Sequence, residues 1–89
     1  MELHGGHRHR LRQRFIQEGL DSFTEVQVLE LLLFYSIPRI DTNEIAHLLI
    51  QRFGSLAQVL DTPVEELQKV PGIGENSAVL LHFRSELTR

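Results

Sequence analysis

The segment between residues 67 and 78 constrains the fold more than any other part of this 89-residue chain. Two helical patterns flank a short turn with the sequence Val70-Pro71-Gly72-Ile73-Gly74. The two glycines have no Cβ, so they can adopt positive φ angles and let another backbone approach closely. Apolar residues stand before, inside and after the turn: Leu67, Val70, Ile73 and Ala78. This pattern predicts two helices that are clamped together across a rigid turn.

The start of the helix after this turn is a candidate binding site for an anion. Gly74 stands where the helix begins, and the first N–H groups of a helix have no intrahelical acceptor. These donors and the positive end of the helix dipole attract phosphate groups. The pattern is that of a helix-hairpin-helix, and it predicts nucleic-acid backbone contacts from Pro71, Gly72, Ile73, Gly74, Asn76 and Ser77. The alternative is a tight helical hairpin that only packs the core.

Glu75 argues against phosphate binding by this turn. Its carboxylate stands where a phosphate-binding hairpin would have Lys or Arg, and it repels the ligand. Asn76 and Ser77 are neutral and can still donate hydrogen bonds to a phosphate. The local sequence therefore leaves both interpretations of the turn open.

The formal charge of −3 is unevenly distributed. Residues 1–19 hold four basic and two acidic residues, a balance of +2, whereas residues 20–89 hold five basic and ten acidic residues, a balance of −5. The basic residues of the first segment are Arg8, Arg10, Arg12 and Arg14. We expect them to contact phosphates, releasing counterions, or to cover the apolar surface of their helix with their stems. Arg39, in the turn after Pro38, is a further candidate for phosphate contact.

Every segment of the chain predicts a helix. The expected helices span residues 7–18, 26–35, 41–53, 55–60, 62–69 and 75–89. Gly19 closes the first helix, and Thr24 with Gln27 forms a capping box for the second. Asp41 is the expected N-cap of the third helix, and Thr62-Pro63 the expected start of the fifth. The sequence thus predicts an all-α bundle of five to six helices, one domain over residues 1–89 with residues 1–6 as a flexible start.

Residues 33–46 share a sequence pattern with residues 67–78. Each segment has a helix, an apolar residue followed by proline, a short turn, and a capped helix with an alanine near its start. The first copy lacks glycines and carries Arg39 and Asp41 in its turn. We expect a tandem helix-hairpin-helix with one degenerate copy, although two turns that follow proline could also match by chance.

The residue composition and motifs exclude several classes of protein. The chain has no cysteine, so it has no disulfide framework, thiolate metal site or cysteine nucleophile, which fits a reducing cytoplasm. No apolar run reaches the ~18 residues of a membrane span, and no secretory signal is present. His7 and His9 would point apart on a helix, and no carboxylate completes a metal site with them or with His4. We therefore expect a cytoplasmic, non-enzymatic domain with no metal, no cofactor and no membrane contact.

The chain resembles the N-terminal domain of the RadC family of bacterial proteins. The residues that carry the resemblance are His7-Arg8-x-Arg10-Leu11-Arg12-x-Arg14-Phe15, Glu30-Leu31-Leu32-Leu33-Phe34-Tyr35, Ile37-Pro38-Arg39-x-Asp41-Thr42-Asn43-Glu44-Ile45-Ala46, Leu48-Leu49, Arg52-Phe53-Gly54-Ser55-Leu56, Glu66-Leu67 and Val70-Pro71-Gly72-Ile73-Gly74. The resemblance implies a tandem helix-hairpin-helix domain of a DNA repair protein. In the family this domain precedes a JAB/MPN-like domain, whose His-x-His…Asp motif suggests a zinc hydrolase and is absent here.

Many members of that family carry a lysine shortly after the Gly-x-Gly, whereas this chain has Glu75-Asn76-Ser77. The leading hypothesis is a non-catalytic module that binds DNA independently of sequence. The alternative is a domain that docks on the metal-dependent hydrolase domain of its parent protein, or on another protein, without binding nucleic acid.

Overall fold

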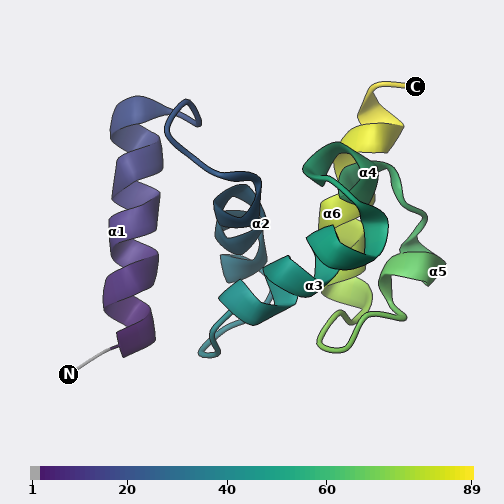
Figure 1. Ribbon diagram of the computed structural model, residues 1–89, viewed down its shortest axis with the longest axis horizontal. Helices are drawn as coiled ribbons and strands as arrows, with labels where there is room; N and C mark the ends of the chain where they lie inside the picture. Colours follow the sequence, from purple (N-terminus) through teal and green to yellow (C-terminus); the bar gives the residue numbers. More distant parts are fainter. Residues whose placement is uncertain (1–2) are drawn as a thin grey trace.

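The computed structural model describes residues 3–89, which form six α-helices (Figure 1). The helices are α1 (Leu3–Glu18), α2 (Glu25–Phe34), α3 (Asn43–Phe53), α4 (Leu56–Asp61), α5 (Val64–Leu67) and α6 (Glu75–Leu87). No strand occurs in this part of the chain, so the all-α prediction is confirmed. α1 begins at Leu3, before the expected start at residue 7, and residues 1 and 2 of the expected flexible start lie outside the described residues. None of the described helices is both long and apolar enough to cross a membrane.

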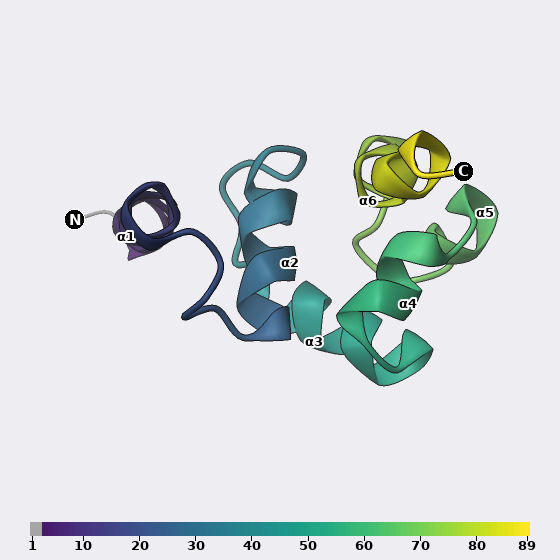
Figure 2. The same cartoon turned by 90° about the horizontal axis from the view of Figure 1, so that it is seen from above.

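The helices follow one another along the longest axis of the molecule. α1 lies at one end beside α2, and α4, α5 and α6 gather at the other end (Figures 1 and 2). α3 runs between these groups and packs on both α2 and α4. α2 also contacts α4 and α6, so this helix occupies the centre of the domain. Its central place agrees with its sequence, which is apolar on most sides.

The main core joins the five helices after α1. Its fully buried members come from every one of these helices and include Leu29, Leu33, Leu49, Val59, Leu67 and Leu81. The four apolar residues expected to hold the hairpin together are also buried, namely Leu67, Val70, Ile73 and Ala78. Burial of each such side chain stabilises the domain by roughly 1–3 kcal/mol. The turn between α5 and α6 is therefore part of the core.

A second, smaller core attaches α1 to the domain. Leu11 of α1 packs against Leu31 and Phe34 of α2, and Phe23 of the preceding loop covers them. This cluster contains far fewer apolar side chains than the main core. The attachment of α1 therefore depends more strongly on polar contacts.

Glycines follow the ends of α1 and α3, and a threonine caps the start of α2, as expected. Gly19 follows α1 with a φ of +70°, and Gly54 follows α3 with a φ of +105°. Thr24 accepts a hydrogen bond from the Gln27 N–H, and Gln27 accepts one from the Thr24 N–H, which completes the capping box. Local sequence chemistry alone determines these boundaries.

Several other expected helix boundaries were wrong. Asp41 is not an N-cap, because Thr42 holds that position and the Asp41 side chain accepts from the Asn43 N–H in the preceding turn. Thr62 ends α4 instead of starting α5, because its hydroxyl donates back to the Gln58 carbonyl at 2.6 Å. α5 therefore starts after Pro63 and ends at Leu67, before the expected end at residue 69, and α6 ends at Leu87.

Candidate nucleic-acid interface

The turn between α5 and α6 is held in one shape by Gly72. Its φ is +92°, a conformation that residues with a Cβ rarely adopt. A Cβ on Gly72 would also lie 2.8 Å from Cδ1 of Ile45, a buried residue of α3. The next residue, Ile73, is buried in the core, and its N–H donates to the Val70 carbonyl at 3.0 Å. The turn therefore packs directly on α3 through a glycine that no other residue can replace without strain.

Gly74 has a different role, because neither its conformation nor its neighbours require glycine. It is the N-cap of α6, with an ordinary φ of −94°, and a Cβ there would have no atom within 4 Å. No side chain caps this helix end. The first N–H of α6 with a backbone acceptor is that of Ala78, which donates to the Gly74 carbonyl. Within the described chain the N–H groups of residues 75–77 have no acceptor, and residues 75 and 76 are exposed, so their N–H groups are available to an anion.

The turn between α2 and α3 lies beside the turn between α5 and α6 and resembles it. Arg39 follows Pro38 with a φ of +71°, as Gly72 follows Pro71 with a φ of +92°. The two hairpins are joined by a hydrogen bond of 2.8 Å between the hydroxyls of Ser36 and Ser77. The similarity has a limit, because Ile73 is buried whereas Ile40 of the other turn is exposed.

A cleft of about 420 Å³ lies between the two turns. It is lined by Ser36, Ile37, Pro38, Gly72, Gly74, Glu75, Asn76 and Ser77. Of the six turn residues expected to bind nucleic acid, four line this cleft: Gly72, Gly74, Asn76 and Ser77. Ser77 is buried and bonded to Ser36, and Ile73 points into the core, so these two side chains serve the packing. The side chain of Glu75 is exposed at the same cleft and places a negative charge there.

Two of the four arginines of α1 hold the domain together. The Arg8 guanidinium donates to the carbonyls of Phe34, Ile37 and Ile40, at 3.1, 2.6 and 2.7 Å, and lies 4.6 Å from the centre of the Phe34 ring. Partial burial lowers the pKa of Arg8 below its ordinary value, and the charge of Arg12 adds to this effect. The engaged guanidinium of Arg8 is a clamp between α1 and the α2–α3 turn.

Arg14 forms the second clamp. Its guanidinium lies 4.4 Å from the centre of the Phe23 ring and donates to the Ser22 carbonyl and to the side chain of Gln27. Its Nε is buried without a hydrogen-bond partner in the described structure. Arg10, in contrast, is exposed, and Arg12 is half-buried with no such contacts within residues 3–89. Arg39 is exposed beside the cleft between the turns.

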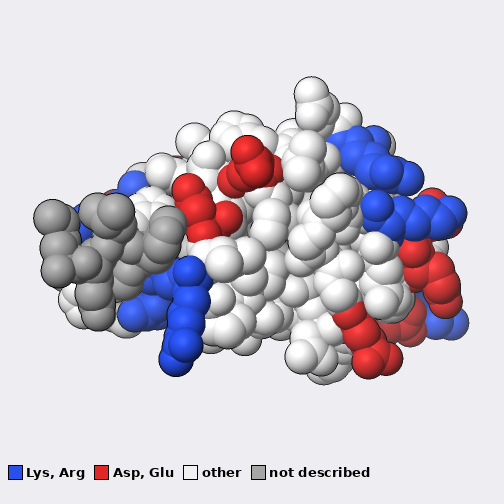
Figure 3. Space-filling view, turned by 90° about the horizontal axis from the view of Figure 1, so that it is seen from below, with Lys and Arg blue, Asp and Glu red and all other residues white. Residues whose placement is uncertain are grey.

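Positive charge does not form one continuous surface on the face shown in Figure 3. Basic side chains of this face gather at the two ends of the molecule, and acidic side chains and a wide uncharged area separate them. The electrostatic attraction that this face offers to a polyanion is therefore weak and divided.

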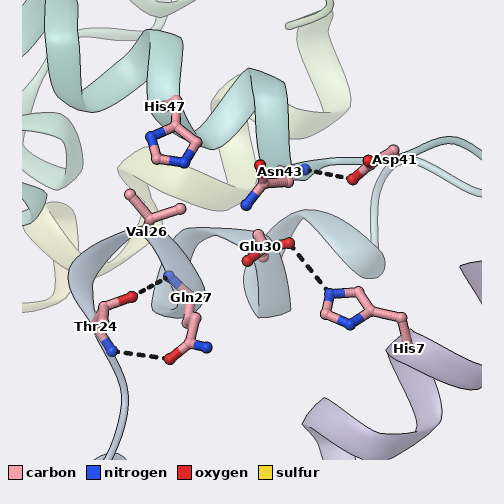
Figure 4. Close-up of a pocket in the computed structure, with 8 residues that line it drawn as sticks. All are labelled: His7, Thr24, Val26, Gln27, Glu30, Asp41, Asn43 and His47. Atoms are coloured by element: carbon pink, nitrogen blue, oxygen red, sulfur yellow. Dashed lines mark hydrogen bonds and ion pairs between the residues drawn. The ribbon is translucent and has the colours of Figure 1, made fainter.

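A larger cleft, of about 730 Å³, lies between α1, α2 and α3 (Figure 4). Glu30 of α2 is buried at its wall, and His7 of α1 points toward it with Nε2 at 3.3 Å from the carboxylate. His47 and Asp41 line other parts of the wall. Among the side chains that the structure describes, no group of three or more could hold a metal ion. The His7–Glu30 contact is a polar link between α1 and α2.

His82 links α6 to the junction of α4 and α5. Its Nδ1 lies 2.8 Å from the Thr62 carbonyl and its Nε2 lies 2.9 Å from the Glu86 carboxylate. Both contacts suit an imidazolium, which donates from both nitrogens. The hydrogen bond with Glu86, followed by that with Thr62, raises the pKa of His82. The same hydrogen bond with His82, and then that with Arg89, lowers the pKa of Glu86.

An exposed apolar groove adjoins the cleft, and the sequence reasoning missed it. Tyr35 at the end of α2 and Phe83 of α6 are 69% and 57% exposed, and Val79, which lines the same groove, is 49% exposed. The spacing of Val79, Phe83 and Leu87 places one apolar residue on each turn of α6. This spacing is a signal that the sequence offered, but the contribution of Tyr35 depends on the tertiary fold.

Comparison with known proteins places the chain in a family. The model of the UPF0758 N-terminal family matches residues 6–79. A UPF0758 protein of Fusobacterium nucleatum is 44% identical over 82 residues, which are 92% of this chain and 35% of that protein. A UPF0758 protein of Ruegeria pomeroyi is 48% identical over 69 residues, which are 78% of this chain and 31% of that protein.

The chain thus spans about a third of the length of these curated relatives. No solved structure matches the chain. The family match covers most of the chain and includes both hairpin turns, the cleft between them and the arginines of α1. The chain therefore belongs to the UPF0758 N-terminal domain family.

Proposed function

We propose that this domain is a non-catalytic module that binds DNA through the phosphate backbone and independently of sequence. The observation that carries the proposal is the open start of α6. The N–H groups of residues 75–77 have no acceptor within the described chain, and no Cβ on Gly74 stands in front of them. A phosphate oxygen can therefore approach these donors to hydrogen-bond distance. The pairing of two similar turns across the Ser36–Ser77 hydrogen bond supports a tandem helix-hairpin-helix.

The proposal assigns the charged contacts to the arginines that are not engaged as clamps. These are Arg10 and Arg12 of α1, and Arg39 beside the cleft. Arg8 and Arg14 would act indirectly, because their guanidinium groups hold α1 in place. Glu75 and the overall charge of −3 weaken the attraction. We therefore expect weak binding to duplex DNA, with a log–log salt slope of roughly −2 to −4 for about two to four phosphates.

We extend the proposal to the longer proteins that share this domain. The resemblance to the RadC family supports a role in DNA repair in the cytoplasm of bacteria. There the domain would hold DNA near a JAB/MPN-like domain acting as a zinc-dependent hydrolase. The chain covers only about a third of its relatives, which leaves room for such a domain in them.

Fluorescence anisotropy of labelled DNA at several salt concentrations tests the proposal. The informative variant is Gly74→Asp. Its carboxylate would accept hydrogen bonds from the free N–H groups and repel a phosphate. Aspartate is also a favourable N-cap, so this variant should fold at least as stably as the wild type. Gln51→Glu is the matched control, because it adds a negative charge at an exposed position of α3 away from the cleft.

We expect Gly74→Asp to lower the affinity about tenfold, roughly 1.4 kcal/mol, and Gln51→Glu to have little effect. Equal affinities for the wild type and both variants would refute a phosphate site at α6. A flat titration of the wild type at low salt would refute DNA binding altogether.

A second candidate function is docking on another protein or on the hydrolase domain of the parent. The observation that favours it is the exposure of apolar side chains at the end of α1 and in the turn that follows, where Phe15, Ile16 and Leu20 are 43%, 70% and 46% exposed. Apolar side chains that gather on a surface mark interaction sites in many proteins. Isotope-labelled domain can be titrated with the C-terminal two-thirds of the Fusobacterium relative. Resonance shifts confined to α1 that Ile16→Ser abolishes would support docking, and an unchanged spectrum would refute it.

A further inference from the structure

The groove between the end of α2 and α6 is lined by two exposed aromatic residues and by aliphatic side chains. It has a volume of about 500 Å³ and is lined by Tyr35, Ser36, Asn76, Val79, Leu80 and Phe83. Tyr35 and Phe83 are both more than half exposed. A single exposed aromatic residue needs no explanation, but two rings that line one groove form a surface on which flat ligands can stack.

This groove is continuous with the cleft between the two turns. Ser36 and Asn76 line both of them, so they form the boundary between the two hollows. On one side of this boundary lie the free N–H groups at the start of α6, and on the other side lie the two rings. A chain molecule with an anionic backbone and flat side groups could occupy both hollows at once.

Two arginines are close in sequence to residues that line this path, and one carboxylate lines it. The guanidinium groups of Arg39 and Arg84 have no hydrogen bond or ion pair within residues 3–89. Arg39 follows Pro38 at the cleft, and Arg84 lies one helical turn after Leu80 of the groove. Glu75 is the carboxylate that lines the cleft, and no carboxylate lines the groove. Glu86 of the same helix is bonded to His82 and Arg89.

From these observations we infer that the domain prefers unpaired nucleic-acid strands, with bases stacked on Tyr35 and Phe83. The inference rests on the proposed function and specifies its ligand. A phosphate of the strand binds at the start of α6, and the adjoining bases enter the groove. Stacking on aromatic rings requires no particular base, because every base has a π face. The bases of a duplex are stacked on each other, so duplex DNA engages only the phosphate site.

Tyr35 provides a direct readout, because it is the only tyrosine and the chain has no tryptophan. Tyrosine emission can be followed while the domain is titrated with oligothymidine, or with a strand of equal length made of abasic tetrahydrofuran units. We expect oligothymidine to quench the emission and to bind about tenfold more tightly than the abasic strand. The abasic strand keeps the phosphates, so it should bind weakly without quenching.

Variants at the groove separate stacking from the phosphate contact. Phe83→Ala should lower the affinity for oligothymidine about tenfold and leave the affinity for the abasic strand unchanged. Tyr35→Phe should keep the wild-type affinity because it retains the ring. Ile16→Ala is the matched control, because it removes an exposed apolar side chain from α1. The exposure of Phe83 lets its variant fold, which circular dichroism can verify.

The outcomes distinguish this inference from the proposed function. Equal affinity for both strands without quenching would overturn the inference and leave the phosphate site intact. Binding of neither strand would overturn both. Concentration-dependent sedimentation that Phe83→Ala abolishes, with no change in DNA affinity, would show that the groove binds a second protein molecule, which would also overturn the inference.

Discussion

Replacing Gly72 by alanine is expected to destabilise the domain, whereas replacing Gly74, two residues later, is not. The contrast follows from the two backbone conformations. Gly72 has a φ of +92° and Gly74 has a φ of −94°. A Cβ on Gly72 would lie 2.8 Å from Cδ1 and 3.2 Å from Cγ1 of Ile45, whereas a Cβ on Gly74 would meet no atom within 4 Å.

The free-energy change for Gly72→Ala has three contributions. A left-handed conformation costs a residue with a Cβ about 1–2 kcal/mol. Moving the buried Ile45 side chain out of its preferred rotamer costs about 0.5–1.5 kcal/mol. The lower entropy of the unfolded alanine chain offsets about 0.4–1 kcal/mol of this loss. We expect a net destabilisation of about 2 kcal/mol, which lowers the melting temperature of a domain of this size by roughly 8–16 °C. Gly74→Ala should be close to neutral, because the lower entropy of the unfolded alanine chain, worth about 0.4–1 kcal/mol, is offset by a similar loss from alanine as a poorer N-cap of α6.

Urea denaturation followed by circular dichroism measures both changes. A double-mutant cycle with Ile45→Val tests the contact itself, because valine lacks Cδ1. Ile45→Val alone should cost about 0.5–1.5 kcal/mol, but the double variant should be more stable than the sum of the single changes implies. Equal effects of alanine at Gly72 and Gly74, or strict additivity in the cycle, would refute the packing argument.

Three further predictions concern Arg8 of α1, the contacts of His82, and Arg39 in the turn between α2 and α3. Arg8→Ala should destabilise the domain by about 2–4 kcal/mol in urea denaturation, because three carbonyls lose a charged donor. Arg10→Ala is the control and should change stability by less than about 0.5 kcal/mol. His82 has a folded pKa above its ordinary value of 6.5, so its stabilisation is complete below pH 6.5 and is lost as the pH rises through the folded pKa. A melting temperature that falls over this range in the wild type but not in His82→Gln would agree, and identical profiles would contradict the assignment. Arg39→Gly should relieve a left-handed φ of +71° and raise stability by up to about 1 kcal/mol, while anisotropy should show weaker DNA binding. A loss of stability would show that the Arg39 side chain supports the turn.

Much of the fold could be predicted because its boundaries depend on neighbouring residues. The capping box of Thr24 and Gln27 and the positive φ of Gly19 involve only a few consecutive residues. The start of α5 could not be predicted in this way, because the Thr62 hydroxyl has two possible backbone partners. It bonds to Gln58 behind it instead of capping the helix ahead. A choice between two local hydrogen bonds depends on how the flanking helices pack.

The candidate site was only partly predictable, for a related reason. The glycines of the turn between α5 and α6 indicated a helix start with free N–H groups. The structure places four of the six expected turn residues around one cleft. The sequence could not show which arginines bond within the domain and which face solvent. Arg8 is held by Phe34, 26 residues away, whereas Arg10 is free to face solvent. Tyr35 and Phe83 are even further apart in the chain, and only tertiary packing brings them to one groove.

The small second core under α1 has a consequence for how the molecule opens. α1 packs on α2 through few apolar side chains, and the main core does not include it. Proteins open locally where few apolar contacts hold an element. We expect the amides of α1 to exchange with deuterium before those of α2 and α6. Each opening would uncover Leu31 and Phe34 and release Arg8 and Arg14 from their ring and carbonyl contacts. The opened form would therefore carry two more available cations than the closed form, and polyanions would favour it.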